Sequence, residues 1–385
     1  MTGVDLARGL ALLGMMAKHV FDDVTEHGPT ATGWIASGRA ATTFALVAGV
    51  SIAFLSGGRR ILHGRARTAA AAGLAARALL IGTIGLLLGF AGAGIELILA
   101  YYAVFFLLSI PLLGLRPRTL ALLSVAFAAL GPVLLVATAG MDLPTSGTDQ
   151  PTLVTLATEP LGLLVQILVT GDYPAVVYMA FVCAGLAIGR LDLTSRRVAG
   201  WLLGGGVALA AASQVVSRIL LYPLGGLDRL IAADHLHGSR AAIATELLWD
   251  PPDTSSWWDL VLPAPHAHTT LDVVNVLGSA MAVLGASLLL TRIRALGRLL
   301  GPIEAAGTMT LTLYSGHILL IALGVFEDWE IAQYLFLVVS SIAFAVLWRR
   351  WRNQGPLEKI VATASGDVRR AVLGSSPPIT AAARD

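Results

Sequence analysis

The residues best placed to do chemistry follow one face of the first apolar segment, 4–22. Asp5, Arg8, Leu12, Met15 and His19 are spaced by three and four residues, so in a helix they share one stripe. Arg8 and His19 would lie roughly 16 Å apart along its axis. Ionisable groups within an apolar helix usually face the protein interior and mark function. The stripe predicts a polar site, although an interfacial Asp5–Arg8 ion pair with His19 reaching outward would also explain it.

His19 has charged neighbours at the outer end of this segment. Asp22 and Asp23 follow it by three and four residues, within reach to orient its ring. Histidine suits proton transfer near neutral pH. We therefore expect His19 to act as a base with Asp22 as its partner, and Lys18 to help stabilise an oxyanion.

A second weakly apolar segment, 303–324, carries His317. Thr310, Tyr314 and His317 fall on one stripe, and His317 is about as deep in its helix as His19 is in the first. Matching depth predicts a shared polar cavity, in which His317 is a second candidate for the catalytic base and Tyr314 a candidate to contact the substrate or its oxyanion. The alternative is that such polar residues only join neighbouring helices.

Two further charges lie within apolar segments. Arg39, in segment 33–56, could bind an anion or stabilise an oxyanion, or it could pair with Glu26 or Asp23. Arg77 and Glu96 are interpreted as a structural ion pair.

The composition indicates which elements must position these groups. The 385 residues are 56% hydrophobic and only 13% charged, against about 25% charged in soluble proteins, which excludes a soluble enzyme, a nucleic-acid binder and a disordered scaffold. A membrane-spanning helix needs about 20 mostly apolar residues. The sequence offers ten such windows: 4–22, 33–56, 69–92, 94–114, 119–140, 173–190, 198–219, 270–291, 303–324 and 330–348. We therefore predict an all-α polytopic membrane protein with about ten transmembrane helices in one bundle.

The connections between these windows alternate in charge. Arginines lie in every second connection: 59–67, 116–118, 190–197, 292–298 and 349–352. Carboxylates gather in the others: 22–26, 142–172 and 327–330. By the positive-inside rule both termini are cytoplasmic. The expected protein is a multi-pass protein of the cell membrane, surrounded by lipids.

The chain divides into a transmembrane domain, 1–355, and a cytoplasmic tail, 356–385, expected to be largely disordered. The long outer connection 220–269 is expected to form a partly helical cap. Its histidine pairs 235/237 and 266/268 have no accompanying cysteine, so we expect no metal site. Phosphate-loop, dinucleotide and His-Glu-x-x-His motifs are absent.

Several motifs resemble one family. Arg8-x10-His19 resembles the signature of bacterial membrane O-acyltransferases. The order of motifs along the chain is more similar to the heparan-α-glucosaminide N-acetyltransferase-like proteins, including the YeiB-type group. These motifs run from 5–14 and 38–51 through Gly171-Asp-Tyr-Pro174 and 184–190 to 306–317 and Gly355-Pro-Leu-Glu358.

This resemblance implies transfer of an acyl group, usually acetyl, from cytoplasmic acyl-CoA to a hydroxyl or amine acceptor reached from the outer side. It implies a catalytic role for His19, for which His27 competes. Arg8 with Asp5 is the expected CoA-binding position, because arginine suits phosphates. A carbohydrate or another small molecule is the expected acceptor.

A proton-coupled transporter is the rival interpretation, since buried Arg, His and Asp serve transport equally well. Helices interrupted by Gly or Pro in corresponding halves would favour it. Gly204-Gly-Gly206 has no symmetric partner. The oligomeric state stays open, a homodimer included.

Overall fold

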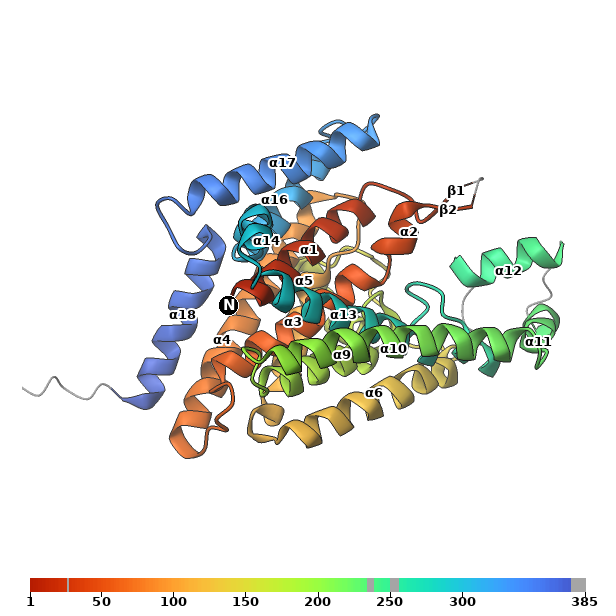
Figure 1. Ribbon diagram of the computed structural model, residues 1–385, viewed down its shortest axis with the longest axis horizontal. Helices are drawn as coiled ribbons and strands as arrows, with labels where there is room; N and C mark the ends of the chain where they lie inside the picture. The colour runs from red at the N-terminus through yellow and green to blue at the C-terminus, as the bar shows by residue number, and fades with distance from the viewer. Residues whose placement is uncertain (26–27, 234–238, 250–255, 375–385) are drawn as a thin grey trace, which may run out of the picture.

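The computed structural model describes residues 1–25, 28–233, 239–249 and 256–374, which are helical apart from loops and one short hairpin (Figure 1). The hairpin pairs two strands antiparallel, with Val24 opposite Pro29.

The elements in chain order are α1 (Thr2–Lys18), β1 (Val24–Thr25), β2 (Gly28–Pro29), α2 (Ala31–Ile35), α3 (Arg39–Leu55), α4 (Gly64–Leu88), η1 (Gly89–Ala91), α5 (Ile98–Ser109), η2 (Pro111–Gly114), α6 (Pro117–Thr138), α7 (Leu153–Thr158), α8 (Pro160–Val165), η3 (Gln166–Thr170), α9 (Ala175–Gly189), α10 (Arg196–Leu221), α11 (Gly226–Ala233), α12 (Arg240–Trp249), η4 (Trp257–Val261), α13 (Thr270–Leu290), α14 (Arg294–Leu299), α15 (Gly301–Gly307), α16 (Thr310–Ala322), α17 (Glu330–Trp348) and α18 (Pro356–Leu373). The protein is therefore an all-α multi-pass membrane protein.

The described residues contain six helices long and apolar enough to cross a membrane, or eight when each of two bent pairs counts as one span. The expected count of ten is not reached on these criteria, because α1 has 17 residues and α5 has 12. Most of α3 is buried, whereas less than a third of the apolar stretch of α6, α10 and α17 is buried inside the protein. The central helices are thus those that carry polar groups, and the outer ones suit contact with lipid.

Two spans are broken, and each break coincides with a motif. Gly171-Asp-Tyr-Pro174 separates the segment Pro160–Thr170 from α9, which turn through 61°. The second break, at Thr308 and Met309, separates α15 from α16, which meet at 87°. Proline cannot donate a helical hydrogen bond, which explains the first break. Broken helices leave backbone groups that need partners, and within a membrane protein these must come from the protein or a cavity.

Small residues hold the central helices close together. A Cβ atom at Gly185 of α9 would lie 1.9 Å from the carbonyl oxygen of Leu46 in α3. At Gly307, the end of α15, it would lie 1.7 Å from the carbonyl oxygen of Asp5 in α1. Only glycine permits either approach. Gly307 therefore fixes α1 beside the break that leads into α16.

The expectation of a largely disordered tail is wrong for residues 356–373, which form α18. This helix lies along α4 (Figure 1), where Ser365 Oγ donates to the carbonyl oxygen of Gly73 at 2.7 Å. Glu358 accepts from the backbone nitrogens of Leu311 and Thr312 at 2.6 and 3.1 Å and so caps α16. The tail is polar because one face of α18 is exposed, and its other face packs on the bundle.

Connection 220–269 contains α11, α12 and η4, which share a small apolar core of Leu221, Leu227, Leu230, Ile243, Leu247 and Leu262. Trp249, at the end of α12, contacts Trp34 of α2 with ring centroids 4.6 Å apart. This segment therefore closes over the same end of the bundle as the acidic connections. Of its histidines, His235 and His237 lie outside the described residues.

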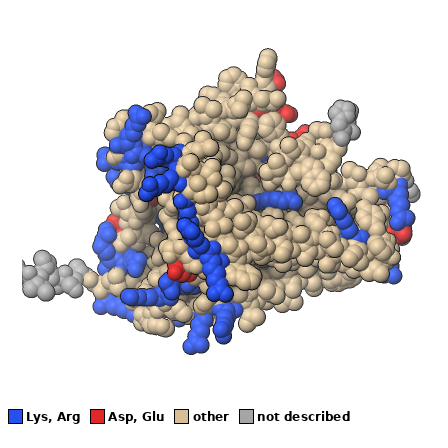
Figure 2. Space-filling view, in the orientation of Figure 1, with Lys and Arg blue, Asp and Glu red and all other residues tan. Residues whose placement is uncertain are grey.

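Charge is segregated between the two ends of the bundle. On the face drawn in Figure 2, most Lys and Arg gather toward the end where α18 and the N-terminus lie in Figure 1. We call this end, with the arginine-rich connections, the basic side, and the opposite end the acidic side. The assignment of the basic side to the cytoplasm remains a prediction.

Candidate active site

The two histidines predicted to share a cavity are hydrogen-bonded to each other. His19 is the C-terminal cap of α1, and His317 lies in the second turn of α16. His19 Nδ1 and His317 Nε2 are 2.9 Å apart, and the rings stack with centroids 5.2 Å apart. His317 is only 1% exposed, whereas His19 is partly exposed. The structure thus brings together two groups separated by 298 residues in the chain.

The hydrogen bonds of this histidine pair determine which nitrogen is free. His317 Nδ1 is 3.2 Å from the carbonyl oxygen of Leu313, which can only accept, so Nδ1 carries the proton. In the neutral pair His317 Nε2 is then an acceptor, and His19 Nδ1 donates to it. His19 Nε2 keeps its lone pair and is available as a base. His317 therefore orients the His19 ring, the role that the sequence analysis assigns to Asp22.

Tyr314 lies one turn before His317 and completes the cluster. Its ring centroid is 5.1 Å from that of His317 and 6.4 Å from that of His19. The backbone nitrogen of Ile98 donates to its hydroxyl oxygen at 3.4 Å, which leaves the hydroxyl hydrogen free to donate. Tyr314 lines a cavity on the basic side, and His19 lines a cavity on the acidic side. The cluster therefore stands between two cavities, and the prediction of one cavity lined by both histidines and Tyr314 is wrong for these two.

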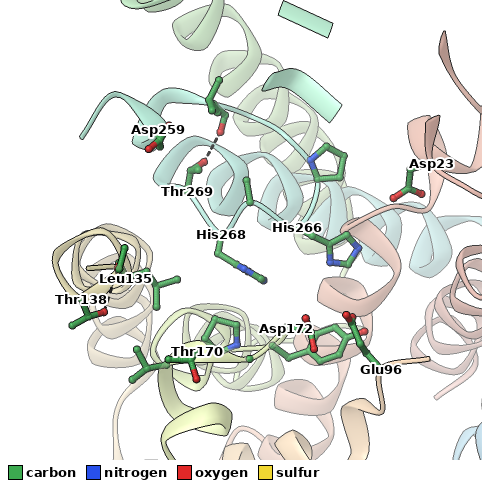
Figure 3. Close-up of a pocket in the computed structure, with 18 of the residues that line it drawn as sticks. Asp23, Glu96, Leu135, Thr138, Thr170, Asp172, Asp259, His266, His268 and Thr269 are labelled. Atoms are coloured by element: carbon green, nitrogen blue, oxygen red, sulfur yellow. Dashed lines mark hydrogen bonds between the residues drawn. The ribbon is translucent and has the colours of Figure 1, made fainter. Parts of the chain in front are cut away.

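The acidic-side cavity has a volume of about 830 Å³. Its walls come from the connection before α5, from the end of α6 and the connection after it, from the break before α9, and from the loop between η4 and α13 (Figure 3). The polar and charged residues on its surface include Lys18, His19, Asp23, Glu96, Thr138, Asp172, Asp259, His266, His268 and Thr269. A cavity of this size and polarity fits a sugar-sized or larger polar molecule.

Glu96 and Asp172 form a carboxyl pair in this cavity. Figure 3 shows them side by side, and they share a hydrogen bond. Partial desolvation, followed by the hydrogen bond and the negative charge of Asp172, raises the pKa of Glu96 to about 8. The pair therefore shares a proton near neutral pH, as two close carboxyl groups do.

His266 and His268 enter the cavity from the loop before α13 (Figure 3). Both have backbone φ angles in the left-handed region, 61° and 54°, which is strained for histidine. The backbone nitrogen of Gly38 donates to His266 Nε2 at 3.0 Å. Burial lowers the pKa of His266 to about 4 and that of His268 to about 3, so both rings are neutral at pH 7.

Lys18 lines the acidic-side cavity next to His19, as expected, and it is already paired. Its Nζ atom is 2.6 Å from Asp23 Oδ2, which also accepts from Ser37 Oγ at 2.7 Å. The structure does not place Asp22 beside His19: its side chain is exposed and does not line the cavity. Of the two adjacent aspartates, Asp23 is the one at the site.

The basic-side cavity is smaller, about 350 Å³, and mostly apolar. Arg8 lies in its wall and donates to Asp5 Oδ1 at 2.8 Å, to the Gly307 carbonyl at 3.0 Å and to Ser51 Oγ at 2.9 Å. The Asp5–Arg8 pair expected from the sequence is therefore present. Arg8 both faces the cavity and ties α1 to the break before α16.

The structure places Arg39, Arg77 and Glu96 differently from the sequence-based interpretation. Arg39 donates to Asn275 Oδ1 at 3.3 Å and lines neither of the two cavities, so it joins α3 to α13. Arg77 and Glu96 do not form the expected pair. Arg77 lines the basic-side cavity and Glu96 the acidic-side cavity, because α4 runs between the two ends of the bundle.

Sequence reasoning missed the carboxyl pair and the role of His266 and His268. The signals that point to them are the Gly171-Asp-Tyr-Pro174 motif and the His-x-His spacing, a pattern that metal sites share. Among the described residues no three His, Cys, Asp or Glu side chains converge as metal ligands. His27, the rival of His19, lies outside the described residues.

Fold and site together define a polytopic membrane protein with a histidine pair between a basic-side and an acidic-side cavity. Residues 1–221 match the family model described as heparan-alpha-glucosaminide N-acetyltransferase, catalytic. Residues 236–365 match one described as a protein of unknown function (DUF418). No curated protein sequence matches the chain at a significant level. The chain belongs to the heparan-alpha-glucosaminide N-acetyltransferase family of membrane acetyltransferases, which confirms the resemblance predicted from its motifs.

Proposed function

We propose that the protein is an acyltransferase that moves an acyl group, acetyl in the simplest case, from cytoplasmic acyl-CoA to an acceptor reached from the outer side. The acceptor is a hydroxyl or amine of a sugar, a glycoconjugate or a related small molecule. Family membership supports transfer chemistry. The observation that carries the proposal is the hydrogen-bonded pair of His19 and His317 between two cavities.

In this reaction the acceptor oxygen or nitrogen bonds to the thioester carbonyl carbon while its proton passes to His19 Nε2. The resulting imidazolium keeps its Nδ1–H bond to His317, which stabilises it. The carbon–sulfur bond then breaks, and the CoA thiolate takes the proton from His19. Each atom and charge returns to its starting state on the protein.

The developing oxyanion needs donors that are already in place. The Tyr314 hydroxyl suits this role from the basic side, since its oxygen accepts from Ile98 and its hydrogen is free. Lys18 supplies positive charge from the acidic side, beside His19. Arg8, with Asp5, suits the anionic donor because it lines the basic-side cavity.

Replacement of His19 by alanine should lower acyl transfer by about 10²- to 10⁴-fold, the usual contribution of a general base. His317→Ala should cost less, because it removes only the group that orients His19. CoA release from acetyl-CoA, with glucosamine as the acceptor probe, measures both in proteoliposomes. His63→Ala, at an exposed histidine before α4, is the matched control. Wild-type turnover in purified His19→Ala would contradict the proposal.

A proton-coupled transporter is the second candidate, favoured by one observation: two spans are broken, one beside each cavity. The breaks fall in the sixth and ninth predicted spans, which are not equivalent positions in two halves of five. Uptake of a labelled metabolite into CoA-free proteoliposomes would support transport. Dependence of every activity on acyl-CoA would exclude it.

A further inference from the structure

Arg77 is a partly buried cation that forms no ion pair with any of the described residues. It lies in the middle of α4, a membrane-spanning helix, and faces the basic-side cavity. Its Nε atom is buried and has no hydrogen-bond partner among the described residues. None of the ion pairs found in that part of the chain includes it. A charge in this position is costly unless a ligand completes it.

The carboxylates nearest to Arg77 form no ion pair with it, because other groups hold them in place. Arg8 repels it, and Glu358 attracts it. Both carboxylate oxygens of Glu358 already accept hydrogen bonds from the start of α16, one from Leu311 and one from the hydroxyl of Thr312 at 2.6 Å. Asp5 is held by Arg8 and by the N-terminal amine. The cavity therefore keeps an excess of positive charge.

A second polar atom in the same cavity also lacks a partner. Tyr102 is 3% exposed, and its hydroxyl is buried without a hydrogen bond among the described residues. The remaining wall is largely apolar and includes Phe44, Ile81, Ile98, Leu99, Phe106 and Leu311. A buried hydroxyl in such surroundings should bind a polar group of a ligand.

These features describe a ligand with one anionic group on a long, uncharged chain that contains polar atoms. A phosphopantetheine arm has this structure: a phosphate, two amides and a terminal thioester. The cavity, at about 350 Å³, is near the lower end of ligand pockets, about 300 Å³, which suits an arm without its nucleotide. Tyr314 lies in the same wall, so the thioester end would reach the histidine cluster.

We propose that Arg77 binds the phosphate, and Tyr102 an amide, of the phosphopantetheine arm of the acyl donor. The donor is thus recognised by its arm, and the adenosine portion contributes little to binding. This inference rests on the proposed acyl transfer and adds the class of donor: any acyl group carried on phosphopantetheine. A phospholipid phosphate entering from the bilayer presents the same anion, and the test separates the two sources.

Calorimetry on detergent-purified protein should use pantetheine, 4′-phosphopantetheine, CoA and short-chain phosphatidylglycerol as probes. Phosphopantetheine should bind about 10- to 100-fold more tightly than pantetheine, the usual effect of a charge-assisted hydrogen bond, and within a few-fold of CoA. Arg77→Gln should abolish the difference and leave the affinity for pantetheine unchanged. Tyr102→Phe should weaken the binding of pantetheine and of phosphopantetheine by the same factor. Arg197→Gln, at an exposed arginine at the start of α10, should change nothing.

Equal affinity of the wild-type protein for pantetheine and phosphopantetheine would overturn the inference, and this comparison needs no variant. So would an Arg77-dependent site that takes phosphatidylglycerol and not phosphopantetheine. If Arg77→Gln does not fold, Arg77→Lys, which keeps the charge, should retain the phosphate preference. If Arg77→Gln transfers the acyl group with an unchanged KM for the donor, this inference is wrong and the proposed function still stands. Failure of every CoA derivative to bind, together with absence of transfer, removes the proposed function as well.

Discussion

The two cavities differ in charge, size and construction. The basic-side cavity is small and largely apolar, with Arg8 and Arg77 set against Glu358. The acidic-side cavity has more than twice the volume, and four carboxyl groups and Lys18 line it. The first is built mainly from helices, and the second mainly from loops, helix breaks and the segment over the bundle. A site assembled in this way selects an anionic donor at one end and a neutral or cationic acceptor at the other.

The helical construction of the basic side makes it the less adaptable of the two. Gly307→Ala should cause the largest loss, because its Cβ atom would lie 1.7 Å from the carbonyl oxygen of Asp5. Backbone cannot move aside as a side chain can, so we expect a loss of more than about 3 kcal/mol and little folded protein. Size-exclusion chromatography and thermal unfolding in detergent measure this.

Two glycines serve as controls for this comparison. At Gly316 in α16 a Cβ atom meets nothing within 4 Å, so Gly316→Ala should be neutral or slightly stabilising. At Gly171, in the acidic-side break, its nearest contact would be the Tyr101 hydroxyl at 2.2 Å, the far end of a side chain, and the nearest backbone atom, the Gln166 oxygen, would lie at 2.9 Å instead of 1.7 Å. Gly171→Ala should therefore cost about 1–3 kcal/mol. Equal losses at Gly171 and Gly307 would contradict the difference in rigidity.

The acidic side should respond to pH through His266 and His268. Burial lowers their pKa values to about 4 and about 3. Below pH 6.5 both imidazoles therefore bind protons in the unfolded chain and stay neutral in the folded chain. Stability should be complete above pH 6.5 and fall as the pH decreases toward 4. Each histidine should contribute about 1.4 kcal/mol per pH unit in that range.

Thermal unfolding between pH 4 and 8 measures this dependence. His266→Asn should reduce the slope of unfolding free energy against pH by the contribution of one protonating group. Asparagine tolerates the left-handed backbone at this position. His63→Asn, at an exposed histidine, is the matched control. An unchanged slope in His266→Asn would show that His266 is not the group that titrates.

The pH effect expected from Glu96 has the opposite sign. Its pKa is raised to about 8, so the folded state holds a proton that the unfolded state loses above its ordinary value of 4.5. This contribution to stability is present below pH 4.5 and is lost as the pH rises toward 8. Glu96→Gln should flatten that loss and raise the unfolding temperature at pH 8. Asp142→Asn, at an exposed aspartate, should not.

The convergence of His19 and His317 was predictable because depth in a membrane helix follows from residue number. The predicted windows also agree with the long helices α3, α4, α6, α10, α13 and α17. The same reasoning chose Asp22 over Asp23 and paired Arg77 with Glu96. Both errors have one cause, since spacing along a helix says nothing of where the chain turns once the helix ends.

The helix breaks and α18 were beyond sequence reasoning for different reasons. The break at 171–174 reads as a motif within an apolar run, and only packing shows that its residues face a cavity. The polar composition of 356–373 resembles a disordered tail, because its apolar side is narrow. Its fixed position depends on a tertiary contact, the cap that Glu358 makes on α16.

The hydrogen bond between His19 and His317 can form only late in the synthesis of the chain. Its partners are 298 residues apart, so the first helix is in the bilayer long before its partner exists. At about 5–20 residues per second, synthesis of the intervening chain takes roughly 15–60 s. During that time Asp5 and Arg8 can neutralise each other, whereas Gly307, Ser51 and His317 join α1 only as their helices emerge. The site is thus among the last parts of the protein to form, and a chain that ends before His317 lacks the histidine pair.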